Sequence, residues 1–322
     1  MTIDVKTAAQ FLREHDNYLI LTHRRPDGDT VGCAVALCRA LRGMGKRAAI
    51  LKNPQFTARY AEYLEGLTTE DVPGDACIVS VDTASAGLLM LGAEALAARV
   101  ELAIDHHGTN DAYAKATLVR GELAACGELL YEVLQELGAD ITPEIAEAIY
   151  VAVSTDTGCF RYSNTTANTL RVAAAMKDLG ADTYHVNKVI FSTKTLARLR
   201  LEAFLVDTLE LRAGGRVGIC ALPDAVLQEI GATEDDADDI AGFARSVEGV
   251  EIAVMLREVE GGKGKISVRT DGDRYSAAAI CRRVGGGGHP GAAGATLECS
   301  ITDAKTAILE AIRAETGLNV DA

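Results

Sequence analysis

The chain has 322 residues, of which 48% are hydrophobic and 24% are charged, a composition typical of a soluble globular protein with room for two domains. Its net charge of −14 argues against a protein that tracks along polymeric nucleic acid, although it is compatible with a short phosphorylated ligand in a locally positive site. No stretch approaches the roughly 18 apolar residues of a membrane span, and the N-terminus has no signal-peptide pattern, so we expect a cytoplasmic protein with reduced cysteines.

The first half of the chain alternates short apolar runs with segments of helical period. This alternation is typical of βαβ units in a parallel sheet. We expect strands at 18–22, 47–51, 77–81 and 101–104, and helices at 32–42, 126–137, 143–154 and 167–179. Pro143 suits the first turn of its helix, because Thr142 before it is a good N-cap.

A second set of elements follows a predicted amphipathic helix at 196–211. We expect strands at 217–222, 251–258 and 265–269, a helix at 276–284, a glycine-rich loop and a last helix at 302–315. The fold class is therefore α/β, with an N-terminal parallel-sheet domain and a smaller C-terminal α/β domain. The expected division is a domain at 1–190, a connecting helix at 191–212 and a domain at 213–322.

Imidazoles and carboxylates follow three of the expected strands and end one of the helices. Open α/β sheets bind their ligands at the carboxyl ends of the strands, so these side chains are expected to converge there. A mixed set of nitrogen and oxygen donors favours hard divalent metals, and imidazole shifts the preference toward Mn²⁺. The residues concerned are His23, Asp27, Asp29, Asp82, Asp105, His106, His107 and Asp156.

Each of these signals has an ordinary structural explanation when it is taken alone. Asp27-Gly28-Asp29 after a strand is often only a turn, and His106 and His107 are compatible with satisfied polar residues at a strand end. Together, however, these explanations require four coincidences at one sheet edge. We therefore favour the metal site, and we expect Gly28 to let the backbone turn tightly between the two aspartates.

The segment Gly-Gly-Gly-Gly-His-Pro-Gly-Ala-Ala-Gly at 285–294 is open to two interpretations. Glycines that end a helix serve as a flexible C-cap, since they adopt left-handed conformations freely. Alternatively, they let the backbone amides approach a phosphate closely. The residues after the glycines favour the ligand site. Arg269 is either an exposed base on a strand or a substrate contact.

In this order, the motifs resemble those of the DHH superfamily of phosphoesterases, and the glycine segment resembles the signature of the associated DHHA1 domain. The chain length is similar to that of the nanoRNase subgroup, which comprises bifunctional oligoribonucleases and 3′-phosphoadenosine 5′-phosphate (PAP) phosphatases. The resemblance implies an active site in the cleft between the two domains.

The resemblance also implies roles for individual residues. Two divalent ions are expected, with Mn²⁺ preferred and Mg²⁺ or Co²⁺ as alternatives. Asp105 is expected to orient an imidazole, and His107 to donate a proton to the leaving oxygen or to contact phosphate. One ion would bind His23, Asp27 and Asp82; the other would bind Asp29, Asp82, His106 and Asp156, so that Asp82 bridges. The substrate would contact Arg269, Gly286, Gly287, Gly288 and His289.

The expected function is Mn²⁺-dependent hydrolysis of short oligoribonucleotides to mononucleotides, and of PAP to AMP. Alternatives that keep the metals are hydrolysis of pyrophosphate, short polyphosphate, or a linear or cyclic dinucleotide. A nucleotide sensor without turnover is the non-enzymatic alternative, and the complete set of metal ligands argues against it. The expected partners are short oligoribonucleotides and small phosphorylated nucleotides, without long nucleic acid or membrane. A homodimer is left open.

Overall fold

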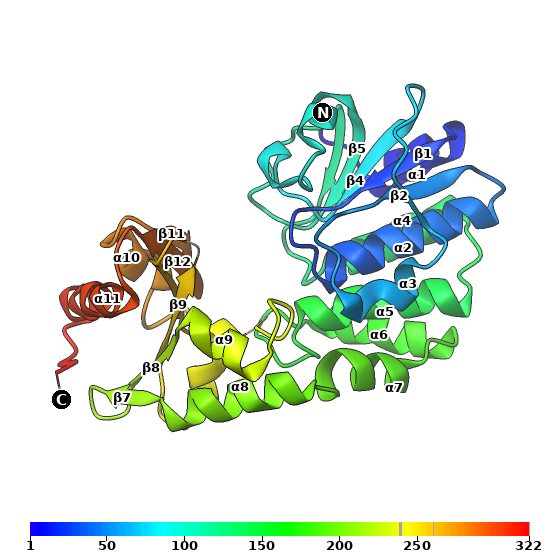
Figure 1. Ribbon diagram of the computed structural model, residues 1–322. Coiled ribbons are helices and arrows are strands. Elements are labelled where there is room, and N and C mark those ends of the chain that lie inside the picture. The colour runs from blue at the N-terminus through cyan, green and yellow to red at the C-terminus, as the bar shows by residue number, and fades with distance from the viewer. Residues whose placement is uncertain (238–239, 260, 322) are drawn as a thin grey trace. The chain divides into compact units, whose positions relative to one another are not determined.

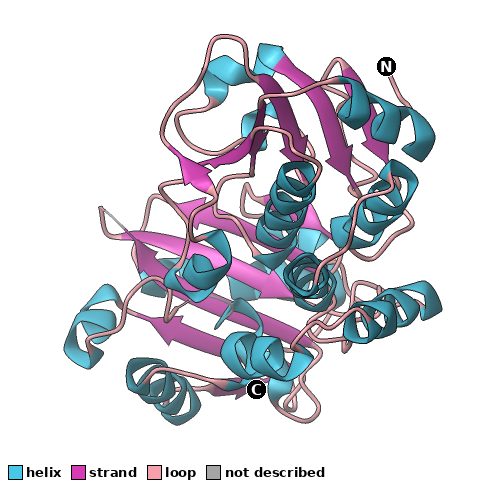
Figure 2. Ribbon diagram, turned by 90° about the vertical axis from the view of Figure 1, so that its right-hand side faces the viewer, coloured by secondary structure: helices cyan, strands magenta, loops and turns pink. Residues whose placement is uncertain are grey.

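The computed structural model describes residues 1–237, 240–259 and 261–321, and it divides into two compact units, Met1–Thr193 and Lys194–Ala322. Each unit is built on its own six-stranded sheet. Figures 1 and 2 show the two sheets with their helices. The α/β class expected from the sequence is therefore confirmed, with a parallel sheet in the first unit and a smaller second unit.

The sheet of the first unit is parallel throughout and has the order β3-β2-β1-β4-β5-β6. Its strands are β1 (Tyr18–Leu21), β2 (Ala48–Leu51), β3 (Thr68–Thr69), β4 (Cys77–Val81), β5 (Val100–Asp105) and β6 (Ala116–Val119). The strand order reverses between β1 and β4. In open α/β sheets this switch point is where ligands bind.

Both faces of this sheet are covered, which explains why its strands are almost wholly apolar. Ile20 of β1 points into the main core, which the helices on that side share. Its neighbours Leu19 and Leu21 point to the opposite face, where Leu89 and Met90 cover them. The side chains of β1 therefore alternate between two buried faces.

The α-helices of the first unit include two that pack unusually close together, α2 and α5. A Cβ added at Gly32 of α2 would lie 2.3 Å from the carbonyl oxygen of Ala148 in α5, so only glycine fits there. The helices are α1 (Val5–Glu14), α2 (Gly28–Gly43), α3 (Ala61–Leu64), α4 (Cys126–Leu137), α5 (Pro143–Asp156), α6 (Ala167–Asp178) and α7 (Thr183–Val186). Short helical turns are η1 (Ala58–Tyr60), η2 (Ala86–Leu88), η3 (Glu94–Arg99) and η4 (Asn187–Ser192).

The second unit has a mixed sheet of order β11-β12-β10-β9-β8-β7, in which only the pair β8–β9 is parallel among the pairings described. Its strands are β7 (Glu210–Arg212), β8 (Val217–Leu222), β9 (Ile252–Val259), β10 (Lys263–Arg269), β11 (Gly287–His289) and β12 (Ala292–Leu297). One core lies between the sheet and the helices α10 (Ala277–Arg282) and α11 (Ile301–Thr316). A second core packs α8 (Leu196–Asp207), α9 (Asp224–Ile230) and η5 (Ile240–Ser246) on the other face.

The structure departs from the expected elements in several places, and α1, α3, α7, α9 and β12 are among the elements that were not expected. The helix expected at 196–211 ends at Asp207, because residues 210–212 pair with β8 instead. The short strands β3 and β6 were not expected, since neither has a distinctive periodicity. The predicted glycine loop contains a strand, β11, paired with β12.

All eight cysteines are free, as expected. Among the helices in the described part of the chain, none is long and apolar enough to cross a membrane.

Candidate functional site

Three strand ends and two helix ends deliver the candidate metal ligands. His23 follows β1, Asp82 directly follows β4, and His106 follows β5. At the start of α2, Asp27 is the N-cap, and its Oδ1 accepts hydrogen bonds from the N–H groups of Asp29 and Thr30 at 3.1 and 3.2 Å. All six residues predicted as metal ligands are brought together within three overlapping groups, whose ligand atoms lie within 4.8 Å of one another: His23, Asp27 and Asp82; Asp29, His106 and Asp156; Asp82, His106 and His107.

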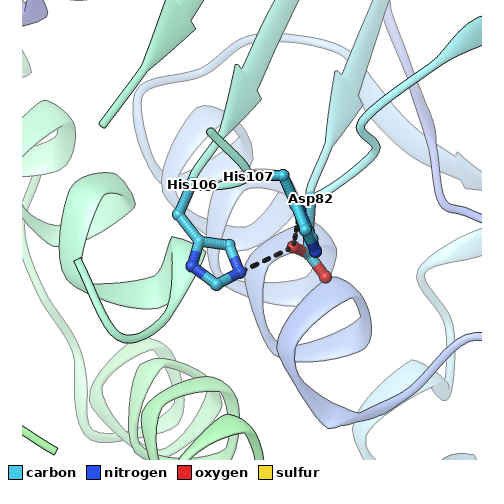
Figure 3. Close-up of side chains that lie close together, drawn as sticks. All are labelled: Asp82, His106 and His107. Carbon is cyan, nitrogen blue, oxygen red and sulfur yellow. Dashed lines mark ion pairs between the residues drawn. The ribbon is translucent and has the colours of Figure 1, made fainter. Parts of the chain in front are cut away.

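Asp82 lies at the centre of this cluster. Its Oδ2 is 3.5 Å from Nε2 of His23. Its Oδ1 is 3.5 Å from Nε2 of His106, and Figure 3 draws this ion pair. The side chain is only 2% exposed, and its backbone has φ 51°, a left-handed conformation that is uncommon outside glycine. Strained backbone of this kind gathers at functional sites, where the surrounding fold enforces it. One carboxylate thus faces two separate imidazoles.

The backbone determines which nitrogen each of these imidazoles presents. Nδ1 of His23 lies 2.8 Å from the carbonyl oxygen of Arg24, and Nδ1 of His106 lies 3.1 Å from that of Leu123. A carbonyl oxygen can only accept, so Nδ1 carries the hydrogen in both rings. In the neutral ring Nε2 is then left with a lone pair that faces the carboxylates, as in the imidazole ligands of metal sites.

The electrostatics of the cluster call for cations. Burial, together with the charges of Asp82 and Asp156, holds the pKa of Asp29 well above its usual range. Burial, opposed by His106 and reinforced by Asp82, raises the pKa of Asp156 to about 7. Burial lowers the pKa of His23, but its contacts with Asp27 and Asp82 outweigh this and raise it to about 11. Clustered carboxylates that stabilise a positive charge beside them fit divalent metal ions.

Asp29 is held by the first turn of α4. Its Oδ2 accepts a hydrogen bond from the N–H of Cys126 at 2.6 Å, and its Oδ1 accepts one from the N–H of Gly127 at 3.0 Å. Helix N-termini favour anions, because their first N–H groups have no partner within the helix. The thiol of Cys33 also contacts Oδ1, at 3.3 Å. These contacts orient the carboxylate toward His106, whose Nε2 is 3.7 Å from Oδ2.

The prediction that Gly28 is needed for a tight backbone turn was wrong. Gly28 is not among the residues with a left-handed backbone, so no tight turn requires glycine there. Instead, a Cβ at this position would lie 2.3 Å from Cγ2 of Thr155 at the end of α5. The missing side chain lets the start of α2 approach the end of α5, which brings Asp29 near Asp156.

His107 differs from the other two histidines. Its Nδ1 lies 2.7 Å from Oδ1 of Asp105, which also accepts the backbone N–H groups of His106 and His107. The bond to Asp105 raises the pKa of His107 to about 9, despite partial burial. Nδ1 is also 3.6 Å from Asp82, but it is engaged by Asp105. The ring is 41% exposed, so this geometry suits a proton donor at Nε2 better than a metal ligand.

Three asparagines that support the cluster were missed in the sequence. Nδ2 of Asn110 donates to Oδ2 of Asp105 at 2.6 Å, and Nδ2 of Asn53 donates to the carbonyl oxygen of His23 at 2.9 Å. Asn164 donates to the carbonyl oxygen of Asp156 at 3.1 Å. Each is a single asparagine without a motif, and only the tertiary contacts reveal its role.

The predicted substrate residues lie in the second unit, where all of them except His289 line a hollow. Arg269 on β10 and Gly286–Gly288 line a cavity of about 650 Å³, together with Lys265, Ile266, Ser267, Gly285 and residues 292–296. His289 is exposed at the end of β11 but is not among the lining residues.

The glycine segment ends helix α10 as a C-cap and then packs closely against strand β12. Gly285 has φ 77° and donates its N–H to the carbonyl oxygen of Arg282, as a helix C-cap does. Beyond it the glycines allow close approach of backbone: a Cβ at Gly286 would lie 2.2 Å from the carbonyl oxygen of Gly294. The segment is therefore built for close strand packing at the rim of the hollow.

The sequence is similar to known protein families and to proteins of known activity. The N-terminal domain of the DHH family matches residues 17–153, and the DHHA1 domain matches residues 219–317. The bifunctional oligoribonuclease and PAP phosphatase NrnA of Thermus thermophilus is 34% identical over 302 residues, which are 92% of this chain and 89% of that protein.

Solved structures share the fold. An exopolyphosphatase-related protein from Bacteroides fragilis has a TM-score of 0.88 at 20% identity, covering 97% of this chain and 96% of that one. RecJ from Thermus thermophilus, solved in complex with Mn²⁺, has a TM-score of 0.54 at 17% identity, covering 98% of this chain and 55% of RecJ. At these identities the likeness is one of architecture.

Proposed function

From the premise that this chain belongs to the DHH family of hydrolytic phosphoesterases, we propose that it cleaves short oligoribonucleotides into mononucleotides. The proposal includes hydrolysis of PAP to AMP, since the Thermus thermophilus relative is named for both activities. We place the reaction in the cytoplasm.

The observation that carries the proposal is the position of Asp82 between two groups of donors. His23, Asp27 and Asp82 would hold one divalent ion. Asp29, His106 and Asp156, with Oδ1 of Asp82 facing the same imidazole, would hold another. Ions held there would supply Lewis acidity, which activates water and offsets the charge of the attacked phosphate. Imidazole among the donors favours Mn²⁺, with Mg²⁺ or Co²⁺ as alternatives.

His107 is proposed as the group that protonates the leaving oxygen. Asp105 holds Nδ1 of its ring, which leaves Nε2 to carry and release a proton at an exposed position. General acids placed in this way contribute rate factors of about 10²–10⁴. A contact with the phosphate of the substrate is the second role that the same position supports.

Substrate binding is assigned to the hollow of the second unit. Arg269 offers a guanidinium that suits phosphate, and the neighbouring glycines have no side chains that would keep a ligand away from the backbone. That one substrate engages both this hollow and the metal cluster is part of the proposal. A cavity of about 650 Å³ accommodates a short ligand, and the net charge of −14 offers no attraction to a long polyanion beyond it.

A single panel of substrates tests the proposal. The Mn²⁺-loaded protein is incubated with di- to heptanucleotides, PAP, pyrophosphate, short polyphosphate and linear and cyclic dinucleotides, and the products are identified. Mononucleotides from short oligomers and AMP from PAP are expected. Exclusive cleavage of pyrophosphate, polyphosphate or a cyclic dinucleotide would replace the proposal with that activity, and binding without turnover of any of them would indicate a sensor.

A further inference from the structure

The hollow of the second unit is floored by cross-strand rows of β10 and β12. The register places Arg269 opposite Ala292, Ser267 opposite Gly294, and Lys265 opposite Thr296. Residues directly opposite each other in an antiparallel pair point to the same face. All six line the hollow, to which Ile266 also contributes, whereas Ile266 and Val268 are fully buried in the core of the second unit.

The three rows differ in the size and charge of their side chains. The middle row consists of the small residues Ser267 and Gly294, which leave space above the sheet. A cationic side chain stands at each end, Arg269 in one row and Lys265 in the other. A strand rises about 3.3–3.4 Å per residue, so four residues separate these two positions by about 13 Å.

We propose that Lys265 forms a second phosphate subsite, which recognises linear oligonucleotides of three or more nucleotides. This inference rests on the proposed function, in which Arg269 binds one phosphate of the substrate. A ligand that reaches both cations must carry phosphates on different nucleotides along a chain. PAP carries its phosphates on a single ribose, so it offers no phosphate on a second nucleotide to Lys265. Ser267 and Thr296 also line the hollow, and hydroxyl side chains bond readily to sugar and phosphate groups.

Lys263 provides a matched control on the same strand. It lies on the same face as Lys265, one row further along β10, but it does not line the hollow. Its Nζ forms an ion pair with Glu298 at 2.7 Å. Replacing Lys263 removes the same charge from the same strand without touching the proposed subsite.

The experiment compares Lys265→Ala with Lys263→Ala in the full-length Mn²⁺-loaded protein. The ratio of kcat/KM for a trinucleotide to kcat/KM for PAP is expected to fall about three- to tenfold in Lys265→Ala, the range for one charge-assisted contact, and to stay unchanged in Lys263→Ala. The slope of log(kcat/KM) for the trinucleotide against log[salt] should become shallower by about 0.7 in Lys265→Ala alone.

A direct binding measurement separates this inference from the proposed function. Anisotropy of a labelled, phosphorothioate-linked trinucleotide should show the same three- to tenfold loss of affinity for Lys265→Ala. Wild-type protein that binds this ligand but hydrolyses no nucleotide would overturn the proposed function alone. An unchanged ratio and affinity in Lys265→Ala, or equal losses in both variants, would overturn the subsite. Wild-type protein that neither binds nor cleaves the trinucleotide would overturn both.

Discussion

Oδ1 of Asp82 lies 3.5 Å from Nε2 of His106, yet no described residue donates a hydrogen bond to this buried oxygen. Buried oxygens without a partner are rare, because desolvation of a polar group is costly unless something compensates. Nδ1 of His106 is engaged by the carbonyl oxygen of Leu123, so in the neutral ring Nε2 also presents a lone pair. Two electron-pair donors that face each other in this way are best explained by a cation between them.

Replacing Asp82 should therefore remove more metal than replacing a ligand of one ion. In Asp82→Ala we expect turnover to be abolished and bound Mn²⁺ to fall further than in Asp27→Ala, because Asp82 faces both donor groups. Metal content and rate are measured side by side on the two variants. If Asp82→Ala keeps as much Mn²⁺ as Asp27→Ala, the bridging assignment is wrong.

Removing the metal should lower the stability of the first unit. Chelation removes the cations from beside Asp29, Asp82 and Asp156. A ligand that binds only the folded state and is present at a hundred times its Kd adds about 2.7 kcal/mol. Thermal unfolding is followed after EDTA treatment and after Mn²⁺ is restored. We expect Tm to fall and then to recover. A Tm that is indifferent to Mn²⁺ would contradict the metal assignment.

The variant His107→Gln should separate proton transfer from metal binding. Because Nδ1 of His107 is bonded to Asp105 and its Nε2 is assigned to the leaving oxygen, we expect kcat to fall about 10²–10⁴-fold while bound Mn²⁺ is retained. The control is His106→Gln, which should lose metal as well as activity. Loss of Mn²⁺ from His107→Gln would show that His107 is a ligand.

Gly28→Ala tests the close approach of α2 and α5. The added Cβ would meet Thr155 at 2.3 Å, so we expect a loss of about 1–3 kcal/mol in the free energy of unfolding and weaker Mn²⁺ binding. Gly43→Ala is the matched control, because Gly43 ends the same helix and has nothing within 4 Å of an added Cβ. Urea denaturation should show no loss for Gly43→Ala. Equal stability of the two variants would refute the steric explanation.

Substrate length should determine the rate. The hollow has a finite span, so kcat/KM is expected to be highest for about two to five nucleotides and to fall for longer chains. His289→Ala should raise KM or lower kcat on dinucleotides without loss of Mn²⁺, since His289 is assigned to substrate. Rates are measured over a length series for wild type and variant. A rate that climbs beyond ten nucleotides would contradict the short-substrate assignment.

The sequence alone sufficed to predict many of the elements, including the bounds of α4 and of β4 as the structure has them. The spacing of apolar residues that distinguishes a helix from a strand can be recognised within a short stretch of sequence. The same is true of strand-end motifs such as Asp105-His106-His107. Because parallel strands align their carboxyl ends at one edge, the clustering of His23, Asp82 and His106 also followed from the chain order. Their roles as ligands stay predictions.

Only the tertiary structure decided how these groups are held. Asp29 is oriented by the N–H groups of Cys126 and Gly127, almost a hundred positions along the chain, and no local pattern encodes such a pairing. The reason for glycine at position 28 likewise lies in Thr155, on another helix. Short-range preferences decide which residues form strands and helices, and therefore which side chains stand at their ends. The orientation of those side chains depends on packing between distant segments, which the linear order of residues does not display.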